Sequence, residues 1–270
     1  MRFKLVLTLF FMLFYGCSTT SSGNFSGEAA VLKYSTDEKS YHFADVSVML
    51  AADAKKKVKA DSNYNPYDRS ITPQGISLQW KMELFSFDYS VAGQKGGFFF
   101  SLPVTIPFDI GMRPSFVQWL GPLYFGAGAS FVFGIYPNLQ DDSYKPDKNS
   151  SWGKTDAFIL WSLGIGTMFD VTEKFSLGFY TTWERLAFNG GGGTTKNYQL
   201  DLDIDIGNGK EDPENNLPAY SFREMVTSFG IHFFATNLKT PLGVYLEYAP
   251  GTFFKNDNCW KLKSGVLVLY

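Results

Sequence analysis

Few residues in this chain of 270 have the types and spacing that catalysis requires. The two histidines are the first candidates. Histidine is the usual acid–base group near neutral pH. A hydrolase or acyltransferase would place His42 or His232 beside a serine and an acid. The stretches YHFADVS and SFGIHFF show no such local pairing. A hydrogen-bonded His232 inside the fold is therefore favoured over catalysis, and we predict that the protein is not an enzyme.

An acidic stretch, DLDIDIGNGKED, has the spacing of a calcium loop. Asp201, Asp203, Asp205 and Asp212 occupy positions 1, 3, 5 and 12 of such a loop. Ile206 stands where the sharp turn needs glycine, and the acids also alternate with apolar residues. Two interpretations stay open: a weak calcium site and an acidic hairpin, of which the hairpin is favoured. No cofactor is predicted.

The N-terminus has the pattern of an export signal. Residues 1–4 are basic, and Leu5–Tyr15 form an apolar run of signal-peptide length. This run is shorter than the roughly 20 apolar residues of a spanning helix. With only Cys17 and Cys259 in the chain, no disulfide framework is possible. We predict a signal peptide over residues 1–16 and an exported protein.

The stretch LFYGCSTTSSG resembles a bacterial lipobox. Gly16–Cys17 precede a Ser/Thr-rich segment, as in that family, which implies a lipid on Cys17 after cleavage. The chain departs from the pattern at Phe14–Tyr15, where the family has an aliphatic and a small residue. Two outcomes stay open: lipidation at Cys17, and cleavage at a small residue such as Ser18 or Ser22.

Composition narrows the fold class and the partners. Hydrophobic residues make up 45% of the chain and charged residues 19%, which excludes a disordered chain. The net charge of −2 gives no basic surface, so nucleic acid is not expected as a partner. The 18% of aromatic residues and the 26 glycines favour strands and turns.

Alternation of apolar and polar residues is the dominant signal after residue 40. In ISLQWKMEL every second residue is apolar, which predicts a strand with two unlike faces. The phase flips at Phe85, so a bulge or bend is expected there. Pro103 and Pro107 remove two ladder donors from the run FFFSLPVTIPFDI, which should therefore be weakly paired or distorted.

Nine such runs are visible, near residues 41–50, 76–91, 98–111, 122–136, 157–170, 175–188, 222–235, 242–250 and 259–270. A tenth strand could lie at 29–35 or 198–206. Residues 114–139 carry no charge, but their prolines, glycines and period of two predict two strands joined by a turn at WLGP. The connections alternate between short and long, as in outer-membrane barrels.

The distribution of side-chain size decides between a soluble sandwich and a membrane barrel. Large residues occupy the apolar faces, whereas the opposite faces are small or ionic, which suits a barrel in lipid. We predict an all-β fold, an antiparallel transmembrane meander barrel of 8–10 strands. Charged groups would pair across the lumen and leave no wide pore. The predicted polar cluster of the lumen is Lys81, Glu83, Glu184, Glu224, His232, Glu247, Lys261 and Lys263.

The last residues, KSGVLVLY, resemble the C-terminal β-signal of outer-membrane barrel proteins. Lys263, Gly265, Val268 and Tyr270 fill its four specified positions at the end of the chain. The resemblance implies that the barrel-assembly machinery recognises this segment.

These observations predict three parts: a signal peptide (1–16), an N-terminal tether (17–40) that could include a short strand, and a barrel (41–270). The expected location is the bacterial outer membrane, with membrane lipids and the assembly machinery as partners. The expected role is structural, an interaction with other molecules, or a narrow passage for small solutes. The alternative is a lipid-anchored lipoprotein whose soluble barrel or sandwich binds an apolar ligand.

Overall fold

The computed structural model describes residues 18–36, 38–53, 58–59, 70–71, 74–106, 109–136, 154–189, 221–250 and 259–270. Within them, ten strands form a closed antiparallel barrel. The last strand pairs with the first from Cys259↔Asp53 to Leu269↔Phe43, which closes the cylinder. The barrel strands are β2 Phe43–Asp53, β5 Gln74–Val91, β6 Gln94–Ile106, β7 Asp109–Leu120, β8 Leu123–Tyr136, β9 Lys154–Thr172, β10 Phe175–Asn189, β11 Ser221–Ala235, β12 Leu242–Pro250 and β13 Cys259–Leu269.

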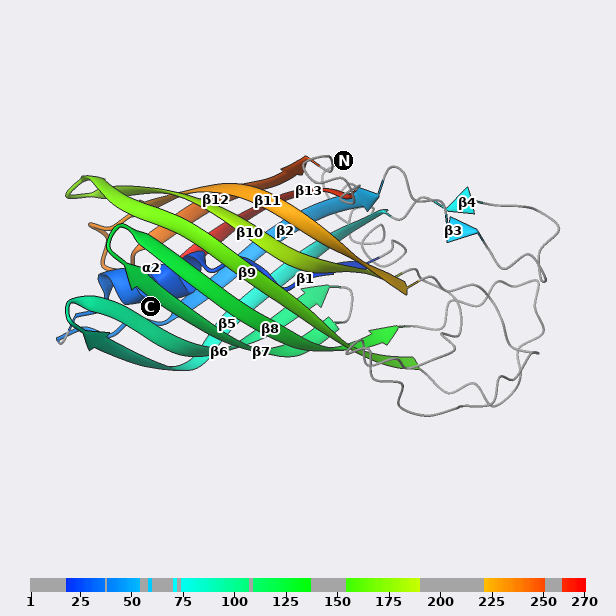
Figure 1. The fold of residues 1–270 in the computed structure, drawn as a ribbon, viewed down its shortest axis with the longest axis horizontal. Coiled ribbons are helices and arrows are strands. Elements are labelled where there is room, and N and C mark those ends of the chain that lie inside the picture. The colour runs from blue at the N-terminus through cyan, green and yellow to red at the C-terminus, as the bar shows by residue number, and fades with distance from the viewer. Residues whose placement is uncertain are drawn as a thin grey trace, which may run out of the picture.

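The two ends of the barrel differ in their connections (Figure 1). At one end, the turn end, strands are joined by short segments at residues 92–93, 121–122, 173–174 and 236–241. At the other, the loop end, the connections span residues 54–73, 107–108, 137–153, 190–220 and 251–258. Two short strands, β3 Val58–Lys59 and β4 Ser70–Ile71, pair with each other beyond the loop end.

The tenth strand is neither of the two segments proposed for it from the sequence. Residues 29–35 were considered as a strand, but a helix, α2, covers Ser26–Tyr34. The segment 198–206 lies outside the described residues. The tenth strand is β7, which follows β6 after only two residues and is joined to β8 by the predicted turn at WLGP.

The irregularities predicted in two strands are present. The register between β5 and β6 shifts between Glu83 and Phe85, where the alternation changes phase. The β6–β7 ladder is interrupted at Leu102–Pro103, since its pairs resume only at Val104↔Ile110. Pro107 lies outside the described residues.

The outer surface of the barrel carries large apolar side chains. Trp80, Phe87 and Val171 are 52%, 65% and 58% exposed, and many other aromatic and aliphatic residues on the strands are similarly exposed. The inward faces hold Ser, Thr, Gly and charged residues that are buried. This confirms the inverted pattern predicted from the sequence, and it is the arrangement of a barrel that spans a lipid bilayer.

Glycines on the inward face make room for aromatic rings of the next strand. The register pairs Tyr124 with Gly166, Tyr180 with Gly230 and Tyr245 with Gly265. A Cβ atom added to any of these glycines would come within 2.1 to 2.6 Å of the paired ring. A side chain at these positions would displace the ring, so the small inward face is a packing requirement.

The N-terminal segment lies inside the barrel. It comprises β1 (Ser18–Ser21), residues 22–25 and α2 (Ser26–Tyr34), and we call residues 18–34 the plug. Glu28 in the first turn and Lys33 in the last turn of α2 suit the helix dipole. No helix in the described part of the chain is long and apolar enough to cross a membrane.

Candidate functional site

The plug runs through the lumen from the loop end to the turn end (Figure 1). β1 pairs with β10 from Ser18↔Asn189 to Ser21↔Leu186. The β9–β10 ladder extends only to Glu184↔Ser162, so β1 takes up the edge of β10 beyond that point. At the turn end, α2 is fixed by Trp119, whose Nε1 donates to the carbonyl of Ala29 at 3.2 Å. The plug therefore contacts the wall along the length of the lumen.

A first ionic cluster holds α2 through its acidic side chain. Arg113 and Lys81 both form ion pairs with Glu28, and the Lys81 Nζ–Glu28 Oε2 distance is 3.3 Å. The hydroxyl of Ser115 donates to the same carboxylate at 3.2 Å. Lys81 also donates to the carbonyl of Asn24 at 2.9 Å. We call Glu28, Lys81 and Arg113 the Glu28 cluster; it joins the plug to β5 and β7.

A second ionic cluster lies on the opposite wall. Lys261 forms ion pairs with both Glu184 and Glu247, all three side chains being almost fully buried. The plug supplies further donors: Ser21 Oγ to Glu184 at 2.6 Å, and Asn24 Nδ2 to Glu247 at 3.2 Å. We call Glu184, Glu247 and Lys261 the Lys261 cluster. Because both clusters bond to residues 21–28, the plug satisfies buried charges that would otherwise be costly.

The electrostatics of α2 keep its groups in defined protonation states. Burial alone would raise the pKa of Glu28, but the charges of Lys81 and Arg113 outweigh it and hold that pKa below its ordinary value. Burial raises the pKa of Tyr34 to about 12. Tyr34 is therefore a neutral phenol and donates to Ser176 Oγ at 2.7 Å.

Aromatic packing fixes the middle of the plug. The ring of Phe25 is 1% exposed and lies under the guanidinium of Arg113, whose Cζ is 4.7 Å from the ring centroid. A Cβ atom on Gly126 or Gly164 would come within 2.4 and 2.6 Å of this ring, respectively. These two glycines of β8 and β9 therefore form the seat of Phe25.

A side chain at Gly126 should weaken the packing of Phe25 and so destabilise the plug. We expect Gly126→Ala to lower the free energy of unfolding by about 1–3 kcal/mol, the usual cost of overpacking, because its Cβ would meet Phe25 at 2.4 Å. The change is measured from the denaturant midpoint of the detergent-purified barrel. Ala127→Val on the same strand is the control, since Ala127 is exposed on the outer face. Equal midpoints for the two variants would contradict the packing described.

The structure places most of the predicted lumen cluster inside the barrel. Lys81, Glu184, His232, Glu247, Lys261 and Lys263 are buried there, and Glu83 is buried near the turn end. The charged residues form two clusters, the Glu28 cluster and the Lys261 cluster, whereas the sequence predicted a single polar cluster. The side chain of Glu224 is not among those described.

The two histidines take part in separate contacts. His42 Nδ1 lies 3.0 Å from Glu83 Oε1 at the turn end. His232 Nδ1 lies 3.0 Å from Ser26 Oγ, a pairing between β11 and the plug that no local sequence pattern shows. The structure therefore gives His232 a place in holding the plug.

Some lumen residues were not identified from the sequence. Arg113 and Asp109 belong to β7, which the strand count omitted, and Asp45 lies on the polar face of β2. The alternation of apolar and polar residues along β7 and β2 could have identified these three residues. Glu28 could not have been found in that way, because its role depends on a helix lying inside the barrel.

The C-terminal residues also have structural contacts. Lys263 pairs with Glu247 in register, and Gly265 lies beneath the ring of Tyr245. Val268 pairs with Ala44 across the closing seam, and the backbone of Tyr270 exchanges two hydrogen bonds with His42. Recognition of these residues by the assembly machinery stays a prediction.

Two other predicted sites, for a lipid and for calcium, fall outside the part of the chain that the structure describes. Cys17 and the acidic stretch with Asp201, Asp203 and Asp205 lie outside the described residues. Within the part of the chain that is described, no group of three or more His, Cys, Asp or Glu side chains could hold a metal ion. Lipidation and calcium binding therefore stay predictions.

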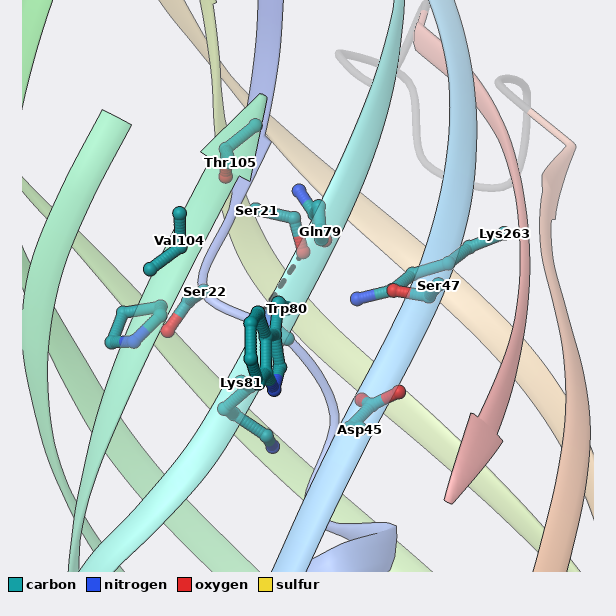
Figure 2. Close-up of a pocket in the computed structure, with 12 residues that line it drawn as sticks. Ser21, Ser22, Asp45, Ser47, Gln79, Trp80, Lys81, Val104, Thr105 and Lys263 are labelled. Carbon is teal, nitrogen blue, oxygen red and sulfur yellow. Dashed lines mark hydrogen bonds between the residues drawn. The ribbon is translucent and has the colours of Figure 1, made fainter. Parts of the chain in front are cut away.

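A small hollow remains between the plug and the wall formed by β2, β5, β6 and β13 (Figure 2). Its volume of about 10 Å³ is enough for one water molecule. The lining consists of Ser21, Ser22, Gly23, Asp45, Ser47, Gln79, Trp80, Lys81, Pro103, Val104, Thr105 and Lys263.

Known proteins resemble this chain only remotely. No protein-family profile and no curated protein sequence matches the chain. A NanC porin structure is 10% identical, with a TM-score of 0.35 over 84% of this chain and 98% of that chain. The Pseudomonas putida toluene transporter TodX is 10% identical, with a TM-score of 0.29 over 96% of this chain and 74% of that chain. Likeness this remote carries no argument, so the fold assignment depends on the strand order and register above.

Proposed function

We propose that the chain is an integral β-barrel protein of the bacterial outer membrane whose lumen is closed by its own N-terminal segment. The observation that carries this proposal is the burial of the plug. Residues 19–32 are buried throughout, and they bond to ionic groups on opposite walls. In this closed form the protein acts as a structural or interaction component of the membrane. Passage of small solutes requires the plug to move.

The exposed apolar band supports membrane integration over the soluble alternative. A soluble lipoprotein that bound an apolar ligand would keep its large side chains inside around a cavity. Here the large side chains face outward, and the lumen holds the plug. Heat-modifiable migration and resistance to carbonate extraction test this part of the proposal. Extraction by carbonate alone would favour the lipoprotein.

Two features of the chain ends complete the proposal. The barrel-assembly machinery is the partner that Lys263, Gly265, Val268 and Tyr270 would engage. A lipid on Cys17 would add an anchor, which globomycin-sensitive processing tests.

The intact protein should conduct poorly. We expect little or no conductance in planar bilayers, because residues 19–32 of the plug are buried inside the lumen and bond to its opposite walls. The measurement is single-channel recording on protein whose folding is first checked by heat-modifiable migration. Large, stable conductance steps from the folded protein would contradict a closed lumen.

A further inference from the structure

The direction in which the plug crosses the lumen is fixed by contacts at both of its ends. At the loop end, Ser18 pairs with Asn189, the last residue of β10. At the turn end, Lys33 Nζ donates to the carbonyl of Met168 at 2.9 Å and forms an ion pair with Asp170 at 3.0 Å. The first residue of the plug therefore lies at the loop end, and its last helical turn lies at the turn end (Figure 1).

After the plug, the chain stays at the turn end until the wall begins. The carbonyl of Ser35 accepts a hydrogen bond from Lys95 Nζ at 2.7 Å, close to the short turn at residues 92–93. Phe43, the first residue of β2, pairs with Leu269, the last residue of β13. The ten strands thus begin and end at the turn end. Because the plug adds one further crossing, its first residue and the end of β13 lie at opposite ends of the barrel.

The outer end of the plug is held firmly to the wall. Four residues of β1 pair with β10, from Ser18 to Ser21. Beyond them, Ser22 Oγ lies 3.2 Å from Ser130 Oγ and 3.0 Å from Ser162 Oγ. These contacts join the plug to β8, β9 and β10, so the position of its first residue at the loop end is a fixed feature of the fold.

The lengths of the connections assign a side of the membrane to each end. In barrels of the outer membrane, short turns face the periplasm and longer loops face the outside of the cell. The turn end carries the connections at residues 92–93 and 121–122, whereas the loop end carries those at 137–153 and 190–220. On this basis the loop end faces outward and the turn end faces the periplasm.

We propose that the plug spans the outer membrane as an additional crossing, with Ser18 at the outer face of the cell and Tyr34 on the periplasmic side. The chain then crosses the membrane once more than its ten strands require, and the end of β13 lies on the side opposite to Ser18. The outer end of the plug is within reach of molecules outside the cell. The inference rests on the proposed location in the outer membrane, since that location defines the two sides.

An epitope inserted immediately before Ser18 tests this topology in whole cells. In the full chain, expressed in a bacterium with an outer membrane, an antibody should label the epitope on intact cells as strongly as on permeabilised cells. Two matched insertions calibrate the sides of the membrane. An epitope within residues 190–220 should be labelled on intact cells, and one after Leu238, in the connection at the turn end, only after permeabilisation.

Two outcomes would overturn the proposal. In the first, the epitope before Ser18 needs permeabilisation while the one within 190–220 does not, which would place the start of the plug on the periplasmic side. In the second, both need permeabilisation, which would mean that the loop end faces the periplasm. If processing removes the first epitope, Ser18→Cys gives the same readout with a membrane-impermeant maleimide, in a chain whose Cys17 and Cys259 are replaced by serine.

The proposed function is tested separately in the same variants. Resistance to carbonate extraction and heat-modifiable migration show whether each variant is a folded barrel in the membrane. A folded, membrane-integrated barrel whose first epitope is hidden would overturn the topology alone. Protein that carbonate extracts would contradict the proposed membrane barrel itself.

Discussion

Deletion of residues 18–34 is expected to turn a silent barrel into a conducting one. The plug fills the lumen from β10 at the loop end to Trp119 near the turn end, so its removal leaves a water-filled passage. The wall charges of both ionic clusters would then be hydrated, which lets the ten-strand wall survive without its plug. Single-channel recording in planar bilayers measures the change, with the intact chain as reference.

A synthetic peptide of residues 18–34 provides the control for this deletion. Added to the deleted barrel, it should block the new conductance, and a scrambled peptide should not. Heat-modifiable migration shows whether the deleted barrel is folded. A folded, plugless barrel that stays silent would mean that the wall alone closes the lumen.

Substitution of Glu28 should produce the largest loss of stability from a single residue. Glu28→Gln leaves the buried cations Arg113 and Lys81 without their carboxylate, and breaking a buried ion pair in this way costs about 3–5 kcal/mol. The denaturant midpoint of the purified barrel measures the loss. Glu38→Gln is the matched control, because Glu38 is exposed next to the same helix.

A compensating variant separates charge from packing. Replacing Glu28, Lys81 and Arg113 together by Leu, Met and Met should recover much of the stability, since no buried charge is then left alone. If Glu28→Gln matched the stability of Glu38→Gln, the Glu28 cluster would not hold the plug.

Acid should have the same effect as this substitution. The pKa of Glu28 in the folded protein lies below its ordinary value of 4.5, so its contribution to stability is present above pH 4.5. The contribution is lost as the pH falls through the lowered pKa. Glu28→Gln should therefore lose less stability on acidification than the unaltered chain.

The fold was predictable because alternation is a local signal. A strand with one lipid-facing and one lumenal side shows both faces within ten residues, and the bulge at Phe85 appears as a change of phase. The strand before the turn at WLGP was predicted but not counted as a separate crossing, because only residues 107–108 separate β6 from β7. With Ile106, Phe108 and Ile110 all in phase, the period of two continues across the connection.

The plug could not be predicted, because its position is a tertiary property. AAVLKYS is a short apolar run, which periodicity alone cannot assign to strand or helix. The contacts that place it join distant positions, such as Ser26 to His232 and Glu28 to Arg113. The small inward residues were correctly predicted, but their partners were not. Gly126 and Gly164 accommodate Phe25, which belongs to the segment predicted as a tether.

A disulfide between the plug and the wall tests the central claim most directly. Ser22 Oγ lies 3.0 Å from Ser162 Oγ inside the lumen. With Cys17 and Cys259 replaced by serine, the pair Ser22→Cys and Ser162→Cys should oxidise to a closed loop. The loop migrates faster on a denaturing gel until it is reduced. The control pair, Ser22→Cys with Val171→Cys, should not cross-link, because the side chain of Val171 is 58% exposed on the outer surface of the barrel. Absence of the 22–162 disulfide, together with rapid labelling of position 22 by a water-soluble maleimide in the folded barrel, would contradict a plugged lumen.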